Sequence, residues 1–237
     1  MSSSATGPDP EKIHSLFSSI AGGYDKANDW MTFGLAHSWR KTLVRESGAK
    51  SGDYILDCAT GTGDLAIEFK KAVGVSGRVI GSDFCAEMLA LAPAKAKALK
   101  LEIIFEQADA MNLPYQDSTF DVVSIAYGIR NVGDPTKALR EMARVCKPGG
   151  HVMILETGDT HLPIFSTAMK FYFKNVVPRI GGWITGRPQA YDYLNKSSLS
   201  FPSREKFVQL MNSTGSFKEV SFRSLMGGAS FIYKAKV

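Results

Sequence analysis

The feature that most limits the fold of this chain is the stretch YILDCATGTGD at residues 54–64. A short apolar run ends at Asp57, a glycine-rich turn follows, and a helical pattern begins at Asp64. Glycine lets the backbone approach a ligand closely, and the first turn of a helix offers unpaired N–H groups. The order of strand, glycine turn and helix therefore predicts a ligand-binding turn at the end of a first strand.

Strand-like and helix-like patterns alternate after this turn. Pro93 interrupts the helical pattern at residues 86–99, so we expect a kink or two short helices there. Gly227 and Gly228 join the last two strand-like runs, which predicts an antiparallel hairpin. The alternation predicts an α/β fold with a doubly wound, mostly parallel sheet. Its seven expected strands lie at about 54–58, 78–83, 101–106, 120–126, 151–156, 217–225 and 229–236.

The segments outside this pattern have a different character. Residues 1–50 are expected to form a tail and N-terminal lid helices beside one main domain at 51–237. Asp9, which is followed by proline, is typical of a helix start, and a second helix is expected at about 37–46. An aromatic and basic insertion at about 160–200 interrupts the main domain. We expect this insertion on the substrate side.

Two classes of cofactor are compatible with a glycine turn. A nicotinamide site would use G-x-G-x-x-G, whereas this turn has no third glycine at that spacing. A carboxylate at Asp64 would repel a pyrophosphate but tolerate S-adenosylmethionine, which carries a sulfonium and an ammonium. Asp83, at the tip of the second strand, is placed to accept hydrogen bonds from ribose hydroxyls, and Asp109 from the adenine amino group. We therefore predict S-adenosylmethionine, with a nicotinamide cofactor as the alternative.

Charge and hydropathy limit the partners. The net charge of +5 and pI near 9 suggest an anionic partner, but the basic residues are dispersed and form no block with interleaved aromatics. We therefore expect no nucleic acid, and we expect either an anionic membrane surface or an ordinary solvated surface. No apolar run approaches the roughly 20 residues that span a bilayer. The first residues lack the pattern of a secretion signal, which predicts a cytoplasmic protein, with association at the inner face of the membrane left open.

The three cysteines indicate no metal site by their spacing. Cys58, Cys85 and Cys146 match neither a zinc nor a disulfide pattern, which suits a reducing cytoplasm. Cys58 lies inside the glycine motif. It is either a nucleophile or, as is commoner at a strand end, a small buried thiol.

Several motifs together resemble a known family. DCATGTGD, GSDF, QADAMNLP and RVCKPGG are similar to the motif series of class I methyltransferases, which have a Rossmann-like fold. The longer segments 24–40 and 120–158, with AYDYL at 190–194, closely resemble the UbiE/MenG family of ubiquinone and menaquinone biosynthesis C-methyltransferases. The resemblance covers nearly the whole chain. It implies methyl transfer from S-adenosylmethionine to a ring carbon of a prenylated quinol, which is a lipid.

The resemblance also implies which residues bind the cofactor. They come from the ends of the first four predicted strands and from the turns that follow. They are Asp57, Thr60, Gly61, Thr62, Gly63, Asp83, Phe84, Asp109, Ala110 and Ala126.

Four residues are candidates for the chemistry. Arg130 follows the C-terminal end of the fourth strand, where ligands bind in open α/β sheets, so we expect it to donate to a phenolate or to activate water. Alternatively, Arg130 pairs with a nearby carboxylate for structural reasons. Asn131 would position a quinol oxygen. His37 is either a general base or an orienting, packed histidine, and Tyr191 is either a substrate-side hydroxyl or part of the core.

Some questions stay open at this stage. The aromatic helical face at 165–177 is either core or a wall for the prenyl tail. The patterns do not choose between a benzoquinol and a naphthoquinol, set the prenyl length, or decide whether the protein is a homodimer. The alternative function is a non-catalytic, membrane-associated cofactor-binding module of a quinone-synthesis assembly.

Overall fold

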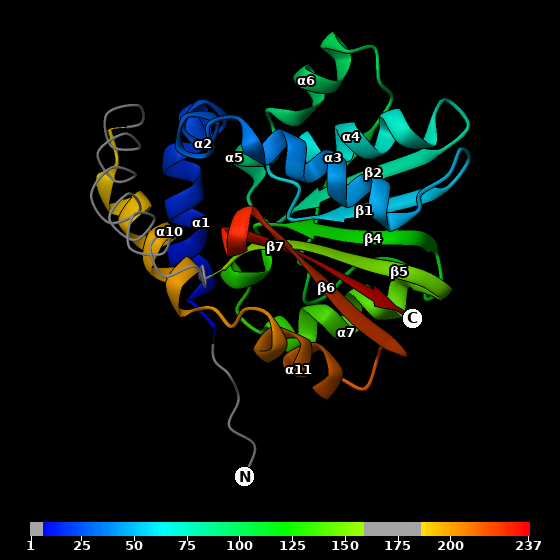
Figure 1. The fold of residues 1–237 in the computed structure, drawn as a ribbon. Helices are drawn as coiled ribbons and strands as arrows, with labels where there is room; N and C mark the ends of the chain where they lie inside the picture. The colour runs from blue at the N-terminus through cyan, green and yellow to red at the C-terminus, as the bar shows by residue number, and fades with distance from the viewer. Residues whose placement is uncertain (1–6, 159–185) are drawn as a thin grey trace.

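The computed structural model describes residues 7–158 and 186–237. Its centre is a seven-stranded sheet with the order β3-β2-β1-β4-β5-β7-β6 (Figure 1). β7 runs antiparallel to β5 and to β6, and the other neighbours are parallel. The predicted fold, including the terminal hairpin, is therefore confirmed. The strands are β1 Tyr54–Cys58, β2 Arg78–Asp83, β3 Ile104–Gln107, β4 Phe120–Ala126, β5 Cys146–Thr157, β6 Glu219–Leu225 and β7 Ser230–Lys236.

Helices cover both faces of the sheet. α3 (Leu35–Ser47) and α4 (Asp64–Val73) lie on one face, and α7 (Pro135–Val145) and α11 (Glu205–Ser213) lie on the other (Figure 1). Successive side chains of a strand point to opposite faces. Ile55 therefore packs into the core beneath α3 and α4, whereas its neighbour Leu56 packs into the core that contains α7 and α11. Burial on both faces explains why β1 and β4 are almost entirely apolar.

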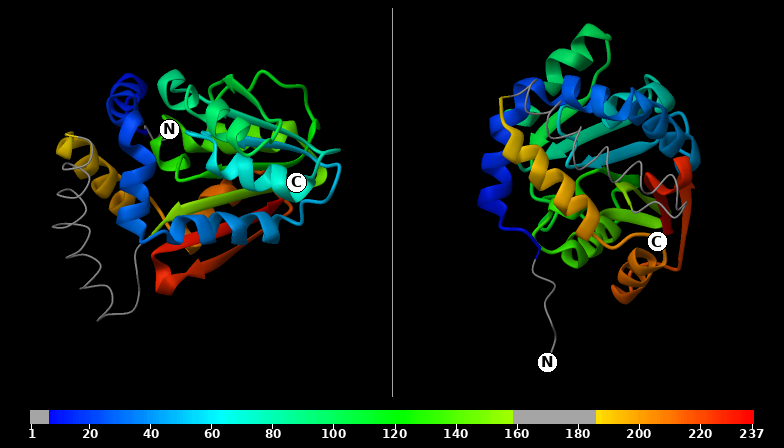
Figure 2. Two further views of the ribbon diagram at one scale, coloured as in Figure 1. Left: turned by 90° about the horizontal axis from the view of Figure 1, so that it is seen from above. Right: turned by 60° about the vertical axis from the view of Figure 1, so that its left-hand side comes forward.

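Three helices gather at one end of the sheet, beside the carboxyl ends of the parallel strands (Figures 1 and 2). They are α1 (Pro10–Ile20), α2 (Tyr24–Thr32) and α10 (Pro188–Ser200). Asp9 caps α1 as predicted, because its carboxylate accepts the N–H of Glu11 at 3.1 Å. A short 3-10 turn, η1 (Ala21–Gly23), then leads directly into α2.

The helical pattern around Pro93 forms two pieces, α5 (Ala86–Leu89) and α6 (Ala92–Ala98). This confirms the predicted interruption, and Pro93 occupies the first turn of α6, where no N–H is needed. β3 starts three residues later than predicted, at Ile104. The cause is the end of α6, because the N–H of Leu101 still donates to the carbonyl of Ala96 at 3.0 Å.

The sequence Lys-Pro-Gly-Gly at residues 147–150 is typical of a helix end, but in the structure these residues belong to β5. α7 ends at Val145, and the chain enters β5 at Cys146, with a register shift against β4. The backbone of Gly150 passes very close to β4, so that a Cβ atom there would lie 2.6 Å from the carbonyl oxygen of Asp121. Glycine is therefore required for strand packing at this point.

The tail at residues 1–6 and the aromatic face predicted at 165–177 lie outside the described residues. Among the helices of residues 7–158 and 186–237, none combines the length and the apolar character needed to cross a bilayer.

Candidate active site

The glycine turn lies between the carboxyl ends of β1 and β4, where the strand order of the sheet reverses. Gly61 and Gly63 have left-handed backbone conformations, with φ of 59° and 87°. Ala59 and Tyr127 also have positive φ, 46° and 56°, although neither is glycine. Strained residues of this kind cluster at functional sites. Gly128 allows the two strand ends to meet, because a Cβ there would lie 2.7 Å from the Cβ of Ala59.

Asp57 supports the turn from below. Its buried carboxylate accepts the hydroxyls of Thr60 at 2.7 Å and of Ser124 at 2.8 Å. Burial raises the pKa of Asp57 to about 7. Asp57 and Thr60 thus hold the turn, and neither lines the cavity in front of it. Their predicted contact with a cofactor stays a prediction.

Asp83 connects the tip of β2 to the same turn. Its two carboxylate oxygens accept the backbone N–H groups of Gly61 at 2.7 Å and of Cys85 at 2.8 Å. Burial raises the pKa of Asp83, and these backbone donors counteract that rise. Because each carboxylate oxygen has more than one acceptor site, Asp83 can hold the turn and still receive hydroxyl donors from a ligand.

A cavity, here called the first cavity, opens at this edge beneath α1 and α2. Its walls include Phe17 of α1 and Tyr24 of α2, and Asn131 also borders it. Six of the predicted cofactor residues line it, namely Gly61, Asp83, Phe84, Asp109, Ala110 and Ala126. Their roles in binding stay predictions, but the structure brings the six together.

The lining of the first cavity fits S-adenosylmethionine. Asp83 offers a carboxylate that can accept from ribose hydroxyls. Asp109 uses one oxygen to accept the N–H of Met111 at 2.8 Å, which holds its carboxylate at the wall. The side chains of Ile13 and Val132 provide apolar surface of the kind that an adenine ring packs against.

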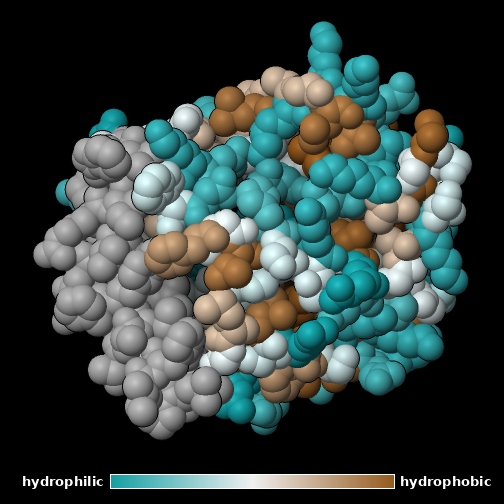
Figure 3. Space-filling view, turned by 45° about the horizontal axis from the view of Figure 1, so that its top comes forward, coloured by the Kyte–Doolittle hydropathy of each residue, from teal (hydrophilic) through white to brown (hydrophobic). Residues whose placement is uncertain are grey.

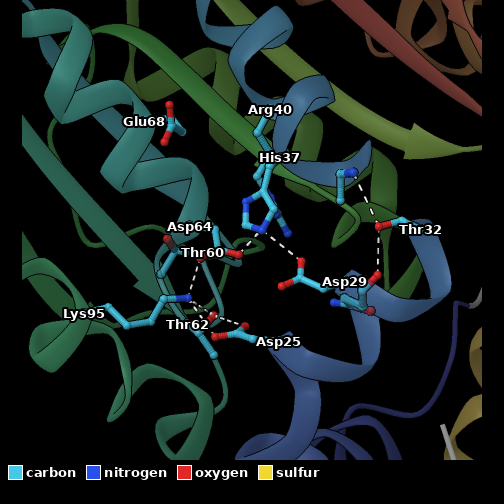
Figure 4. A network of polar contacts seen from close by, with 12 residues as sticks. Asp25, Asp29, Thr32, His37, Arg40, Thr60, Thr62, Asp64, Glu68 and Lys95 are labelled. Atoms are coloured by element: carbon cyan, nitrogen blue, oxygen red, sulfur yellow. Dashed lines mark hydrogen bonds and ion pairs between the residues drawn. The ribbon is translucent and has the colours of Figure 1, made fainter. Parts of the chain in front are cut away.

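A second cluster of polar residues closes α2 onto the glycine turn (Figure 4). The ammonium of Lys95 lies 2.8 Å from the carboxylate of Asp25 and 3.0 Å from the hydroxyl of Thr62, and it also contacts Asp64. Thr62 in turn donates to Asp25 at 2.6 Å. Arg40 pairs with the other oxygen of Asp64 at 3.1 Å. We call these five residues the lid clamp.

The lid clamp corrects the role expected for Asp64. Burial alone would raise the pKa of Asp64, but Arg40 and Lys95 keep that pKa below its ordinary value. Its charge is therefore balanced by two protein cations, and it does not line the first cavity. At the start of α4, Asp64 thus joins Arg40 of α3 to Lys95 of α6. Thr62 and Gly63 also lie outside the first cavity's lining, so their predicted cofactor contacts are untested.

A larger apolar cavity, here called the second cavity, lies between α2, α3 and α10. Two of the predicted catalytic residues, Arg130 and Tyr191, line it. Tyr24 and Tyr127 line both cavities, so the two spaces meet at this pair of tyrosines. Burial raises the pKa of Tyr24, which keeps its hydroxyl protonated. Sequence patterns placed Tyr24 in a lid segment but gave no sign of this junction.

Arg130 is almost completely buried and contacts the carboxylate of Glu156, which is 1% exposed. One Nη1 hydrogen also donates to the carbonyl of Tyr127 at 3.0 Å. The Nε atom is buried and has no hydrogen-bond partner within residues 7–158 and 186–237, and the same holds for Glu156 Oε2. The ion pair that was expected as the structural alternative therefore exists. Arg130 also lines the second cavity, and one donor and one acceptor atom of the pair are left to form further hydrogen bonds.

The other candidates lie in different places. Asn131 donates to the carbonyl of Tyr127 at 3.3 Å and accepts from the hydroxyl of Tyr193 at 3.4 Å. His37 is half exposed and pairs with Asp29 at 2.8 Å (Figure 4), and it lines neither cavity. Its role as a base stays a prediction that this geometry does not favour. Cys58 is fully buried in the core, and burial raises its pKa, which argues against a nucleophile.

A doubly wound sheet of this order, with a carboxylate-lined cavity at its switch point, has the architecture of class I S-adenosylmethionine-dependent methyltransferases. Solved methyltransferases share the fold. A structure from Thermotoga maritima has a TM-score of 0.67 at 18% identity and covers 94% of this chain and 99% of its own. One from Aquifex aeolicus has a TM-score of 0.60 at 20% identity and covers 96% and 98%.

The particular family follows from the sequence comparison. The model of the ubiE/COQ5 methyltransferase family matches residues 5–236, and the chain belongs to this family. It is 56% identical to the ubiquinone/menaquinone biosynthesis C-methyltransferase UbiE of Bdellovibrio bacteriovorus, over 97% of each protein. It is 40% identical to the demethylmenaquinone methyltransferase of Staphylococcus saprophyticus, over 94% of this chain and 95% of that protein. The protein is thus an enzyme that uses S-adenosylmethionine as methyl donor.

Proposed function

We propose that the protein methylates a ring carbon of a prenylated quinol, either a demethylmenaquinol or a polyprenyl methoxybenzoquinol. The relatives' names supply the substrate class. The observation that carries the proposal is the junction of the two cavities at Tyr24 and Tyr127. A methyl donor in the first cavity and an apolar acceptor in the second would meet at that junction, as direct transfer requires.

The apolar character of the second cavity supports a lipid acceptor. Met31, Leu35 and Trp39 contribute to its wall from the lid helices, and Leu194 contributes from α10. Arg130 is a buried cation at this wall. A cavity with apolar walls and few polar groups orients a ligand through those groups. A quinol has this composition, because its ring oxygens are polar and its prenyl tail is not.

Arg130 would assist the chemistry by electrostatics. S-adenosylmethionine supplies an electrophilic methyl group on a sulfonium. A quinol carbon becomes nucleophilic when the adjacent hydroxyl loses its proton, and Arg130 would stabilise the resulting charge on oxygen. Glu156 fixes the orientation of the guanidinium, and the Nε hydrogen is available as a donor. The hydroxyl proton would pass to solvent, and a new C–C bond would replace the C–S bond as S-adenosylhomocysteine leaves. The methylated ring carbon would then release its proton to solvent, and the ring oxygen would regain a proton.

Tyr24 and Asn131 would position the reacting partners. Tyr24, buried and protonated, stands at the junction and can donate to a quinol oxygen. Asn131 lines the first cavity beside the junction and is held by Tyr193. Tyr191 is buried at the wall of the second cavity, where its ring would contact the acceptor.

The acceptor would enter from a membrane surface. Phe33 and Met226 come from distant turns, yet both line the second cavity and are exposed by 77% and 46%. Both have left-handed backbones, with φ of 51° and 45°. Trp30 nearby on α2 is exposed by 58%. Apolar atoms also gather on the face shown in Figure 3. With a net charge of +5, such a rim suits an anionic bilayer.

Product mass spectrometry tests the proposal. The enzyme is incubated with S-adenosylmethionine and, separately, with a demethylmenaquinol and a polyprenyl methoxybenzoquinol, each in its reduced and its oxidised form. We expect a mass gain of one methyl on a reduced quinol and none on the quinone, because only the quinol has a hydroxyl proton to lose. Methylation of soluble phenols alone would refute the lipid acceptor. Tight cofactor binding without turnover on any quinol would support a non-catalytic binding module.

A further inference from the structure

Three potential metal ligands, one from α1 and two from the segment that follows β2, lie together at the edge of the first cavity. His14 comes from α1, Cys85 follows β2, and Glu87 belongs to α5. The Nε2 atom of His14 lies 3.3 Å from a carboxylate oxygen of Glu87, and the Cys85 sulfur lies 3.4 Å from the same oxygen. All three ligand atoms lie within 4.8 Å of one another.

We propose that His14, Cys85 and Glu87 bind a zinc-type divalent cation. Zinc takes Cys, His and carboxylate ligands in tetrahedral geometry, with bonds of about 2.3, 2.0 and 2.1 Å. Tetrahedral angles then separate nitrogen from oxygen by about 3.4 Å and sulfur from oxygen by about 3.6 Å. The two separations in the protein are within a few tenths of an ångström of these values. The third pair, the His14 nitrogen and the Cys85 sulfur, lies within 4.8 Å, and an ion would hold these two atoms at about 3.5 Å.

Charge and surroundings also suit a soft divalent ion. A thiolate and a carboxylate together balance its charge, and His14 coordinates as the neutral imidazole. The thiol proton passes to solvent on binding, so the affinity rises with pH. Cys85 lines the first cavity and is reached from it, whereas Cys58 is fully buried within the core. His14 and Glu87 are 36% and 50% exposed, which leaves an approach from outside.

The site would couple an ion to the methyl donor. His14 and Cys85 both line the first cavity, and the ion would tie α1 to α5 across its edge. Without the ion the cluster carries the negative charge of Glu87, and with the ion the cluster is neutral. Loss of that charge lowers the attraction for a sulfonium and an ammonium, so the ion and the cofactor should weaken each other's binding equally.

Cobalt is the probe for the site because its spectrum reports the ligands. Co²⁺ is titrated into the full-length enzyme in the presence of a non-thiol reductant, and Zn²⁺ is then added in competition. We expect a thiolate-to-cobalt charge-transfer band that Zn²⁺ abolishes. Cys85→Ser should remove the band. Glu87→Gln and His14→Ala should weaken cobalt binding at least about tenfold, since even loss of an outer-shell contact has that effect.

Two variants serve as matched controls. His37→Ala removes another lid histidine that is paired with a carboxylate, and Cys146→Ser removes a thiol outside the cluster. Both should retain the band, and metal-free melting temperatures establish that each variant is folded. Absence of the band in the wild-type enzyme, or its survival in Cys85→Ser, would overturn the site. An unchanged affinity for S-adenosylmethionine at saturating Zn²⁺ would overturn the coupling.

Discussion

Lys95 of α6 lies 2.8 Å from Asp25 of α2, which ties α2 to the second of the two helices that follow β2. Lys95→Met removes this contact and should weaken S-adenosylmethionine binding by about two- to fivefold, because partly exposed ion pairs contribute up to about 1 kcal/mol. Isothermal titration at low and high salt measures the effect. Lys71→Met, which breaks the surface pair with Glu68, is the control and should leave the affinity unchanged.

Asp83→Ala should weaken cofactor binding much more strongly. The substitution removes the carboxylate that accepts from Gly61 and Cys85, and with it the acceptor predicted for ribose. Hydrogen bonds to charged groups contribute about 1.5–3 kcal/mol, which corresponds to a loss of about 10- to 150-fold. Equilibrium binding of S-adenosylmethionine and S-adenosylhomocysteine provides the measurement. An affinity equal to that of the wild type would rule out Asp83 as the ribose acceptor.

Arg130 and Glu156 require a double variant. Arg130→Met alone leaves the Glu156 charge buried without its partner, which should cost about 3–5 kcal/mol of stability. Arg130→Met combined with Glu156→Gln should recover most of that stability and still turn over about 10²- to 10³-fold more slowly. Cofactor affinity should be unchanged. Denaturant unfolding and single-turnover kinetics separate the two effects, and a double variant with normal turnover would reduce the pair to a structural role.

Asp57 should make stability dependent on pH. Burial raises its folded pKa to about 7, above the unfolded value. Its contribution is therefore fully present below the unfolded pKa of about 3.9 and is lost as pH rises to about 7. Relative to Asp57→Asn, the wild type should lose up to about 1.4 kcal/mol per pH unit in this window and then level off. Urea unfolding of both proteins from about pH 5 to about pH 8 tests this slope. Parallel curves would contradict it.

The exposed rim of the second cavity should mediate membrane contact. Phe33→Ser with Met226→Ser should lower co-sedimentation with anionic phospholipid vesicles. Val75→Ser, which removes an apolar side chain that is 96% exposed and lines neither cavity, is the control. Equal vesicle binding by all variants would place the contact elsewhere.

The fold was predictable because its signals are local. Apolar runs of strand length alternate with helical patterns, Asp9 marks a helix start and Pro93 marks an interruption, and the structure confirms both. The errors lie where tertiary contacts override local patterns. β3 starts late because the N–H of Leu101, beyond the end of α6, still donates to the carbonyl of Ala96, and the KPGG segment at 147–150 joins a strand because Gly150 permits close packing.

The site was predictable to the extent that topology defines it. Residues that follow parallel strands meet at one edge, so Asp83, Asp109 and Arg130 were expected there. Pairings between distant residues were not predictable, because single-sequence patterns carry no information about them. Neither the contact of Lys95 with Asp64 nor that of Arg130 with Glu156 has a local signal. Only the burial of Arg40 had a local signal. It lies four residues after Ala36 and three before Leu43, and this spacing places it on the buried face of α3.

Because Tyr24 belongs to the walls of both cavities, the lid is common to the donor and acceptor sites. We expect exchange of the spent donor to displace α2, which would also open the wall of the second cavity. This arrangement predicts an ordered mechanism, in which S-adenosylmethionine binds first, the quinol binds second, and S-adenosylhomocysteine leaves last. Quinol bound early would block the exchange of donor, so excess quinol should act as a substrate inhibitor.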